Sequence, residues 1–282
     1  MTGLVAALAA AMAWTGASAL WRSLTGAGTA LELNGLKNGL ATILFLPVLI
    51  TVPWKDQTSA VLLLLLSGVA GIAAGDSFYL GALRRLGTRR TLTVEATNPV
   101  LACIGGVLLM GDRVSTTDWL GAGVVALAVI LIAVHSRADE DVSRNASGIA
   151  LALLSVICGL CGAFLAREVL ISSTLSPLQT ASIRLIGGWL GLLPILRRNV
   201  VGRKLSQPVM VKVFLATVLG TNLGIALQQL VFSSMPVGQG VTLMSTAPVM
   251  ALLVGHLEGD PIQPRGVLAA LLAVTGVALI SL

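Results

Sequence analysis

Thr97-Asn98-Pro99-Val100 recurs 149 residues later as Thr246-Ala247-Pro248-Val249. The same offset maps Gly71-x-x-x-Gly75 onto Gly220-x-x-x-Gly224. Other equivalent pairs, at nearby offsets, are Arg22 with Arg167, Lys37 with Arg184 and Pro47 with Pro194. This repetition indicates that the chain consists of two copies of one structural unit.

The composition around these motifs is that of a membrane protein. Hydrophobic residues make up 56% of the 282 residues and charged residues only 11%, too few to cover the surface of a soluble domain. A helix needs about 20 apolar residues to cross a bilayer. Ten apolar runs of this size are predicted as membrane spans, at residues 3–21, 32–52, 59–83, 88–110, 117–135, 147–166, 177–196, 208–232, 238–257 and 265–282.

Ten spans in two copies give five helices per copy. Because five is odd, the second copy must enter the membrane from the opposite side. The predicted fold is therefore an all-α integral membrane protein of two inverted five-helix repeats around a central cavity, an arrangement that permits alternating access. The predicted divisions are residues 1–136 for the first repeat, 137–146 for a linker and 147–282 for the second repeat.

Basic residues near the helix ends predict the orientation. Twelve lie in the loops that join odd-numbered to even-numbered spans, and three, Lys55, Arg113 and Arg167, lie on the other side. The positive-inside rule then places both termini outside. The basic residues form short clusters between apolar runs, without the continuous stripe that nucleic-acid binding requires, so no nucleic-acid partner is expected.

Four charged residues lie well inside predicted spans: Lys37, Asp76, Glu95 and Arg184. Charges within a bilayer are costly and are functional candidates by default. Lys37, Asp76 and Glu95 lie at similar depths from one membrane face, so they can form a cluster, either as a substrate site or as a structural ion pair. Arg184 has no carboxylate at its depth in its own repeat, which leaves a substrate anion or snorkelling to the interface as alternatives.

The repeated prolines point to the cavity wall. Pro99 and Pro248 are predicted to lie mid-span, where each removes the N–H that would bond the carbonyl four residues back, those of Glu95 and Met244. Irregular backbone at membrane depth is tolerated where it lines a cavity; a simple packed kink is the alternative. Aromatic and polar side chains complete the set of predicted substrate-binding residues, which are Trp14, Lys37, Asp76, Tyr79, Glu95, Asn98, Arg184, Gln228 and Met244.

The order of these motifs, repeated in both halves, resembles the drug/metabolite transporter superfamily. The features that carry the resemblance are the two proline motifs, Gly111-Asp112-Arg113, Glu258-Gly259-Asp260 and a basic residue early in the second and seventh spans. The chain is most similar to the ten-helix EamA-like branch. This resemblance implies a bundle with a central cavity and export of amino acids or related metabolites across a bacterial inner membrane. It also implies both termini inside, opposite to the charge rule.

The leading functional hypothesis is a secondary transporter that exports small polar or amphipathic metabolites, with amino acids as the first guess, by alternating access. The expected partners are a small-molecule substrate, the lipid bilayer and a proton as candidate coupling ion; no cofactor is expected. One alternative is a membrane-embedded enzyme, for which no paired nucleophile and base or metal-ligand spacing is found. Others are a scaffold or sensor, and a drug/proton antiporter, although the first span contains no acidic residue.

Overall fold

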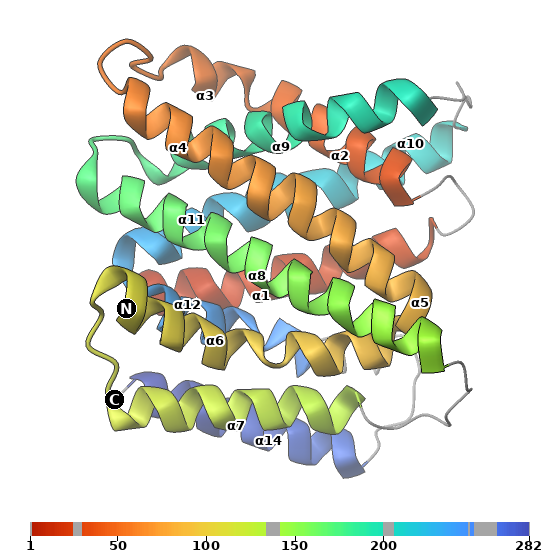
Figure 1. Ribbon diagram of the computed structural model, residues 1–282, viewed down its shortest axis with the longest axis vertical. Coiled ribbons are helices and arrows are strands. Elements are labelled where there is room, and N and C mark those ends of the chain that lie inside the picture. The colour runs from red at the N-terminus through yellow and green to blue at the C-terminus, as the bar shows by residue number, and fades with distance from the viewer. Residues whose placement is uncertain are drawn as a thin grey trace.

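The computed structural model describes residues 2–24, 30–133, 142–199, 206–247, 249–250 and 264–281. These residues form helices and connecting turns, without a strand (Figure 1). In order, the helices are α1 (Thr2–Arg22), α2 (Ala30–Leu44), α3 (Leu46–Ile50), α4 (Thr58–Gly68), η1 (Val69–Gly75), α5 (Asp76–Glu95), α6 (Asn98–Gly105), η2 (Gly106–Met110), α7 (Thr116–Ala133), α8 (Val142–Ser172), α9 (Pro177–Asn199), α10 (Gln207–Ala216), η3 (Thr217–Leu223), α11 (Gly224–Ser234), α12 (Val237–Met244) and α14 (Pro264–Ser281), of which η1, η2 and η3 are π-helical.

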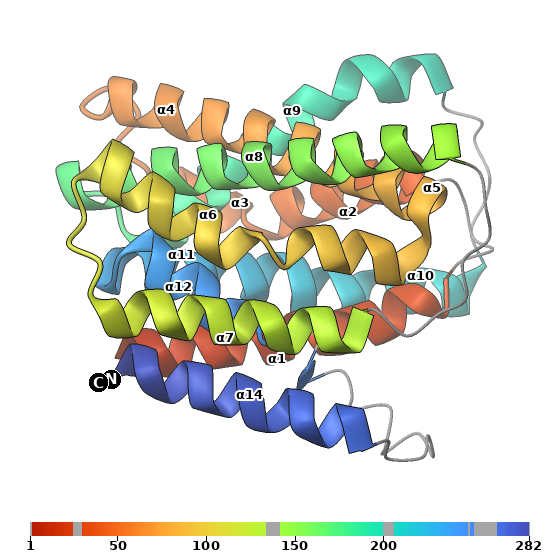
Figure 2. The same cartoon turned by 60° about the horizontal axis from the view of Figure 1, so that its bottom comes forward.

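The helices pack side by side in one bundle, and α1 begins at the same end of the bundle at which α14 ends (Figure 2). Four continuous helical stretches are long and apolar enough to cross a membrane: Thr2–Trp21, Thr58–Leu83, Ala146–Ser172 and Gln207–Ser234. Asn98–Met110, Thr116–Leu131 and Pro264–Ile280 are shorter apolar helices. The all-helical, apolar character of the fold is confirmed, whereas the number of ten spans stays a prediction.

The two halves of the chain contain equivalent elements. The π-helices η1 and η3 are both seven residues long, and α7 and α14 are both 18 residues long. Packing follows the same equivalence, because α5 lies against α8 as α11 lies against α1, while α6 pairs with α12 and α7 with α14. The helices around each π-helix therefore come from both halves.

The proline motif differs from its predicted structure. A turn at Ala96 and Thr97 interrupts the predicted 88–110 span, and Pro99 lies in the first turn of α6 rather than in the middle of a kinked helix. Proline is favoured there because the first-turn N–H has no helical partner to lose. In the second half α12 likewise ends at Met244 before a two-residue turn. Pro248 itself and residues 137–141 of the predicted linker lie outside the described residues.

Small residues allow close helix packing where the halves meet. A Cβ atom added at Gly187 of α9 would lie 2.8 Å from the Cα of Leu65 in α4. Glycine at such a position lets two membrane helices approach closely. Many large apolar side chains, such as Leu108, Leu127 and Leu271, point outward, which is appropriate to a surface in contact with lipid.

Candidate functional site

A cavity of about 260 Å³ lies between η1, α5 and α6 of the first half and α8 of the second half. Its volume falls just below the range of pockets for drug-sized ligands, so it suits a smaller molecule. The residues that line it are Gly71, Gly75, Asp76, Tyr79, Glu95, Asn98, Ser155, Val156 and Gly159.

The cavity brings Asp76 and Glu95 together although they stand at the two ends of α5. In a straight helix, 19 residues would separate them by roughly 28 Å. The chain therefore reverses direction between them, in the region where the sequence predicts the end of one span and the start of the next. Of the nine residues predicted for the site, Asp76, Tyr79, Glu95 and Asn98 lie in the wall of this cavity.

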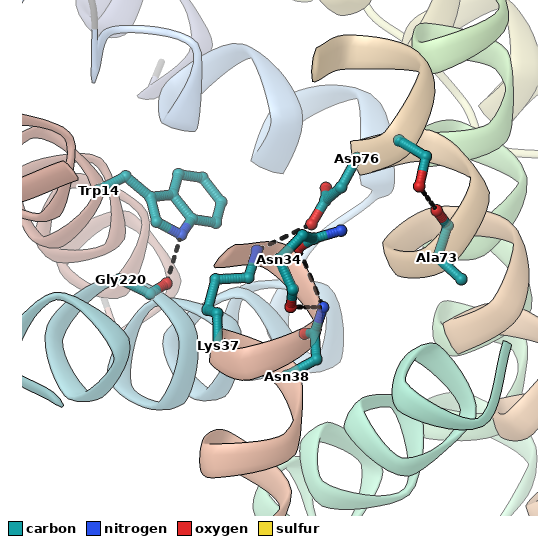
Figure 3. Close-up of polar contacts among 8 residues, drawn as sticks. Trp14, Asn34, Lys37, Asn38, Ala73, Asp76 and Gly220 are labelled. Atoms are coloured by element: carbon teal, nitrogen blue, oxygen red, sulfur yellow. Dashed lines mark hydrogen bonds and ion pairs between the residues drawn. The ribbon is translucent and has the colours of Figure 1, made fainter. Parts of the chain in front are cut away.

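Lys37 and Asp76 form an ion pair beside the cavity. The Nζ atom of Lys37, on α2, lies 3.0 Å from Oδ2 of Asp76 (Figure 3). The side chain of Lys37 is 20% exposed and that of Asp76 is 41% exposed. The sequence allows Lys37 to pair with Asp76 or with Glu95, and in the structure it pairs with Asp76.

Glu95 and Asn98 present acceptors without donors. Oε1 of Glu95 and Oδ1 of Asn98 are buried and have no hydrogen-bond partner among the described residues. Leaving a buried acceptor unpaired costs about 1–3 kcal/mol, so such atoms require an explanation where they occur. Both atoms belong to residues that line the cavity, where a bound molecule with N–H or O–H groups would satisfy them.

Arg184 lies outside the cavity, next to the lining residue Gly71. The residue is only 4% exposed, so it is enclosed by protein and does not snorkel. Nη1 donates to Oε1 of Gln228 at 3.2 Å, and Nε has no partner among the described residues. A Cβ atom added at Gly71, a lining residue, would lie 3.4 Å from Nη2. The guanidinium group is therefore adjacent to the cavity.

Five of the nine predicted residues do not line the cavity: Lys37 and Arg184, which lie next to it, and Trp14, Gln228 and Met244. The indole Nε1 of Trp14 donates to the carbonyl oxygen of Gly220 at 2.9 Å (Figure 3), which directs the ring toward η3. Met244 is 4% exposed and belongs to an apolar cluster with Ala10 and Phe232, against which Trp14 also packs. Gln228 is likewise absent from the wall and contacts Arg184 instead.

The sequence prediction did not include the part of the cavity wall that α8 provides, which consists of Ser155, Val156 and Gly159. Small residues in an apolar run carry no individual signal. The repeat offset of 145 could have singled out Gly159, because it is the equivalent of Trp14. Among the described residues no group of three or more His, Cys, Asp or Glu side chains could hold a metal ion.

Comparison with known proteins gives one family match. The sequence model of the EamA-like transporter family matches residues 1–134 and again residues 146–282. A solved structure described as "Crystal structure of protein" has a TM-score of 0.82 and 15% sequence identity, over 98% of this chain and 95% of that chain; at this identity the likeness concerns the fold alone. No curated protein matches.

Proposed function

The chain belongs to the EamA-like transporter family, and from this premise we propose that it is a secondary carrier that exports small zwitterionic metabolites, amino acids first among them. The family is one of membrane transporters, and the apolar helices are those of a multi-pass membrane protein. The observation that supports the substrate class is the set of unpaired buried acceptors of Glu95 and Asn98 in a cavity adjacent to Arg184.

A zwitterion matches this set of groups. Its ammonium group can donate to Oε1 of Glu95 and Oδ1 of Asn98, which lack donors. Its carboxylate can approach the guanidinium group of Arg184 past Gly71, which has no side chain. Arg184 makes no ion pair with a described carboxylate, and hydrogen bonds to charged groups contribute about 1.5–3 kcal/mol each. The size of the cavity supports the same class, because it is smaller than pockets for drug-sized molecules.

We further propose that Glu95 exchanges a proton for the substrate. Asp76 is neutralised by Lys37, whereas Glu95 has no cation within ion-pair distance among the described residues. A carboxyl group in that position can hold either a proton or the ammonium group of a substrate. Helix α1 contains no acidic residue, so this route to coupling differs from drug/proton antiport through an acid in the first helix.

Counterflow in proteoliposomes tests the proposed function and separates it from the enzyme and scaffold alternatives. Vesicles containing the purified protein and a high internal concentration of an unlabelled L-amino acid should accumulate the same amino acid, radiolabelled, from outside. Only a carrier that reorients with bound substrate gives this transient accumulation. Vesicles without protein are the control for leakage. Folded protein that gives no accumulation with any amino acid of a complete panel would contradict the proposed substrate class.

A further inference from the structure

When the two repeats are aligned, a tryptophan in the first half corresponds to a glycine in the second. The offset of 145 relates α1 to α8 and so pairs Trp14 with Gly159, while the offset of 149 pairs Gly220 and Gly224 with Gly71 and Gly75. The helix contacts in the structure agree with these equivalent pairs. A Cβ atom at Gly224 would meet the indole of Trp14, and one at Gly75 would lie 3.5 Å from the backbone nitrogen of Gly159.

A second pair of contacts supports the same alignment. A Cβ atom at Gly220 would meet the Cβ of Ala17, and Ala17 is equivalent to Gly162. A Cβ atom at Gly162 would in turn lie 3.0 Å from the Cα of Gly71, the equivalent of Gly220. Helix α1 therefore packs on η3 in the same register as α8 packs on η1.

Beside η3, the indole of Trp14 fills the space next to the π-helix. The added Cβ at Gly224 would lie 2.8 Å from Cδ1 of the ring, and Nε1 bonds to the carbonyl oxygen of Gly220 (Figure 3). The equivalents of the other cavity residues are mostly apolar. They are Ala10, Ala11, Ile225, Met244 and Ala247, together with Gln228.

Beside η1, the equivalent space is the cavity itself. A Cβ atom added at Gly159 would meet no atom within 4 Å, although Gly159 lines the cavity. Asp76, Tyr79, Glu95 and Asn98 surround this space at the positions where the second half carries Ile225, Gln228, Met244 and Ala247.

We propose that Gly159 is the specificity-determining residue of the cavity. The missing side chain leaves open the volume whose equivalent beside η3 is filled by the Trp14 indole. It sets an upper size limit, close to that of an indole ring, for the group that the cavity admits. That this group belongs to the transported substrate rests on the proposed function. The size limit itself can be measured without a substrate.

The first measurement uses thiol reagents of graded size. Ser155, a neighbour of Gly159 in the wall, is replaced by cysteine in a background without Cys103, Cys158 and Cys161. The probes are methyl methanethiosulfonate, N-ethylmaleimide and N-benzylmaleimide, applied to purified protein. Gly159→Ala should slow the bulkiest reagent about tenfold, the order of discrimination that one methyl group gives in a pocket, and leave the smallest unchanged. Gly159→Trp should slow all three.

Gly123 of α7 supplies the matched control, because a Cβ atom there also meets nothing within 4 Å and Gly123 does not line the cavity. Gly123→Ala and Gly123→Trp should leave all labelling rates unchanged. If Gly159→Trp fails to fold, Gly159→Ala still decides the result, because its methyl group enters open space. Equal labelling of the Gly159 and Gly123 variants by every reagent would overturn the proposal and leave the proposed function standing.

The second measurement is counterflow with radiolabelled L-alanine and L-tryptophan. Gly159→Ala should reduce exchange of the larger amino acid relative to the smaller by about tenfold, and Gly159→Trp should abolish both. Slower labelling with unchanged counterflow would overturn the assignment of Gly159 to substrate selection. Absence of counterflow in the unmodified protein would instead count against the proposed function, while the labelling series still decides the size limit.

Discussion

Glu95 and Asp76 line the same cavity but differ in their partners. Asp76 pairs with Lys37 at 3.0 Å and is 41% exposed, whereas Oε1 of Glu95 is buried without a partner among the described residues. A carboxylate that already holds a cation has little left to offer a substrate ammonium group. We therefore expect Glu95, rather than Asp76, to be the acid that binds and releases substrate.

Replacing Glu95 should remove the pH dependence of substrate binding. As the pH falls, protonation cancels the charge of Glu95, so affinity for an ammonium group should decrease toward acid pH. Glu95→Gln imitates the protonated form and should bind about 1–3 kcal/mol more weakly at high pH, with a flat pH profile. Binding measured by thermal shift across a pH series checks this. Asp76→Asn should keep most of the pH dependence, and a Glu95→Gln profile identical to that of the unmodified protein would disprove the assignment.

Arg184 should act on the anionic group of the substrate. Glutamine at this position removes the charge but retains a hydrogen-bonding group that can face Gln228. Arg184→Gln should therefore weaken binding by about 1–3 kcal/mol with a smaller effect on thermal stability, as measured by isothermal titration and thermal unfolding of the same samples. Arg113→Gln, at an exposed position in the connection after η2, is the control. Unchanged affinity in Arg184→Gln would assign a purely structural role to the residue.

At the residue scale, the sequence could predict the charged part of the site but not its neutral wall. Lys37, Asp76 and Glu95 stand out because ionised groups are rare within a membrane span. Ser155 and Gly159 do not, because small residues are ordinary packing groups in membrane helices. Trp14 and Met244 were predicted as lining residues from residue type and from the proline motif. Their positions depend on the contacts of η3 and α12, which residue type alone does not predict.

The π-helices are the elements that position the cavity. Asp76 follows η1 directly, and Gly71 and Gly75 within η1 line the cavity. The preceding helix α4 packs against α9 through Gly68, where an added Cβ would collide with the carbonyl oxygen of Arg184 and lie 2.8 Å from the nitrogen of Gly188. Backbone atoms cannot move aside as a flexible side chain can. The close contact at Gly68 therefore fixes the position of Arg184 relative to η1.

Gly68→Ala should consequently destabilise the protein. Overpacking of a close contact costs typically about 1–3 kcal/mol, which should appear as a lower midpoint of thermal unfolding in detergent and as weaker substrate binding. Gly123→Ala adds the same methyl group to open space on α7 and should leave both quantities unchanged. Equal unfolding midpoints for the two variants would show that α4 and α9 can move apart without loss of stability.

At the element scale, the apolar runs predict where the helices lie more accurately than where the helices are interrupted. The predicted span 59–83 agrees closely with the apolar stretch Thr58–Leu83. The sequence predicts that Pro99 kinks a continuous helix, whereas in the structure Pro99 lies in the first turn of α6. A kink and a helix start are both compatible with a residue that has no N–H. The sequence alone therefore does not distinguish between them. Nothing in the composition marks η1 and η3 as π-helical.

The orientation of the whole molecule stays a prediction of its charge distribution. Twelve basic residues against three place both termini outside, opposite to the resemblance. Single cysteines at Asp56 and at Ser206, both exposed in the structure, report on the two faces in a background without the three native cysteines. In intact cells an impermeant thiol reagent should label the cysteine at position 56 and not the one at position 206. The reverse pattern would place both termini inside.

At the scale of the whole molecule, repetition of the sequence was the most informative feature. The offsets read from a few motifs correspond to equivalent elements in the structure, such as η1 with η3 and α7 with α14. They could not predict that a cavity would form beside η1, whereas the indole of Trp14 occupies the equivalent space beside η3. We attribute this difference to the size of two equivalent residues, Trp14 beside η3 and Gly159 beside η1.

Substrate protection of Ser155→Cys tests most directly whether the cavity between α5, α6 and α8 carries the transported molecule. The variant is reconstituted without the other cysteines, labelled with N-ethylmaleimide in the presence or absence of an amino acid active in counterflow, and then assayed for counterflow. We expect the amino acid to slow labelling and complete labelling to abolish exchange. Full counterflow after complete labelling, with no protection by the substrate, would show that transport uses another path through the protein.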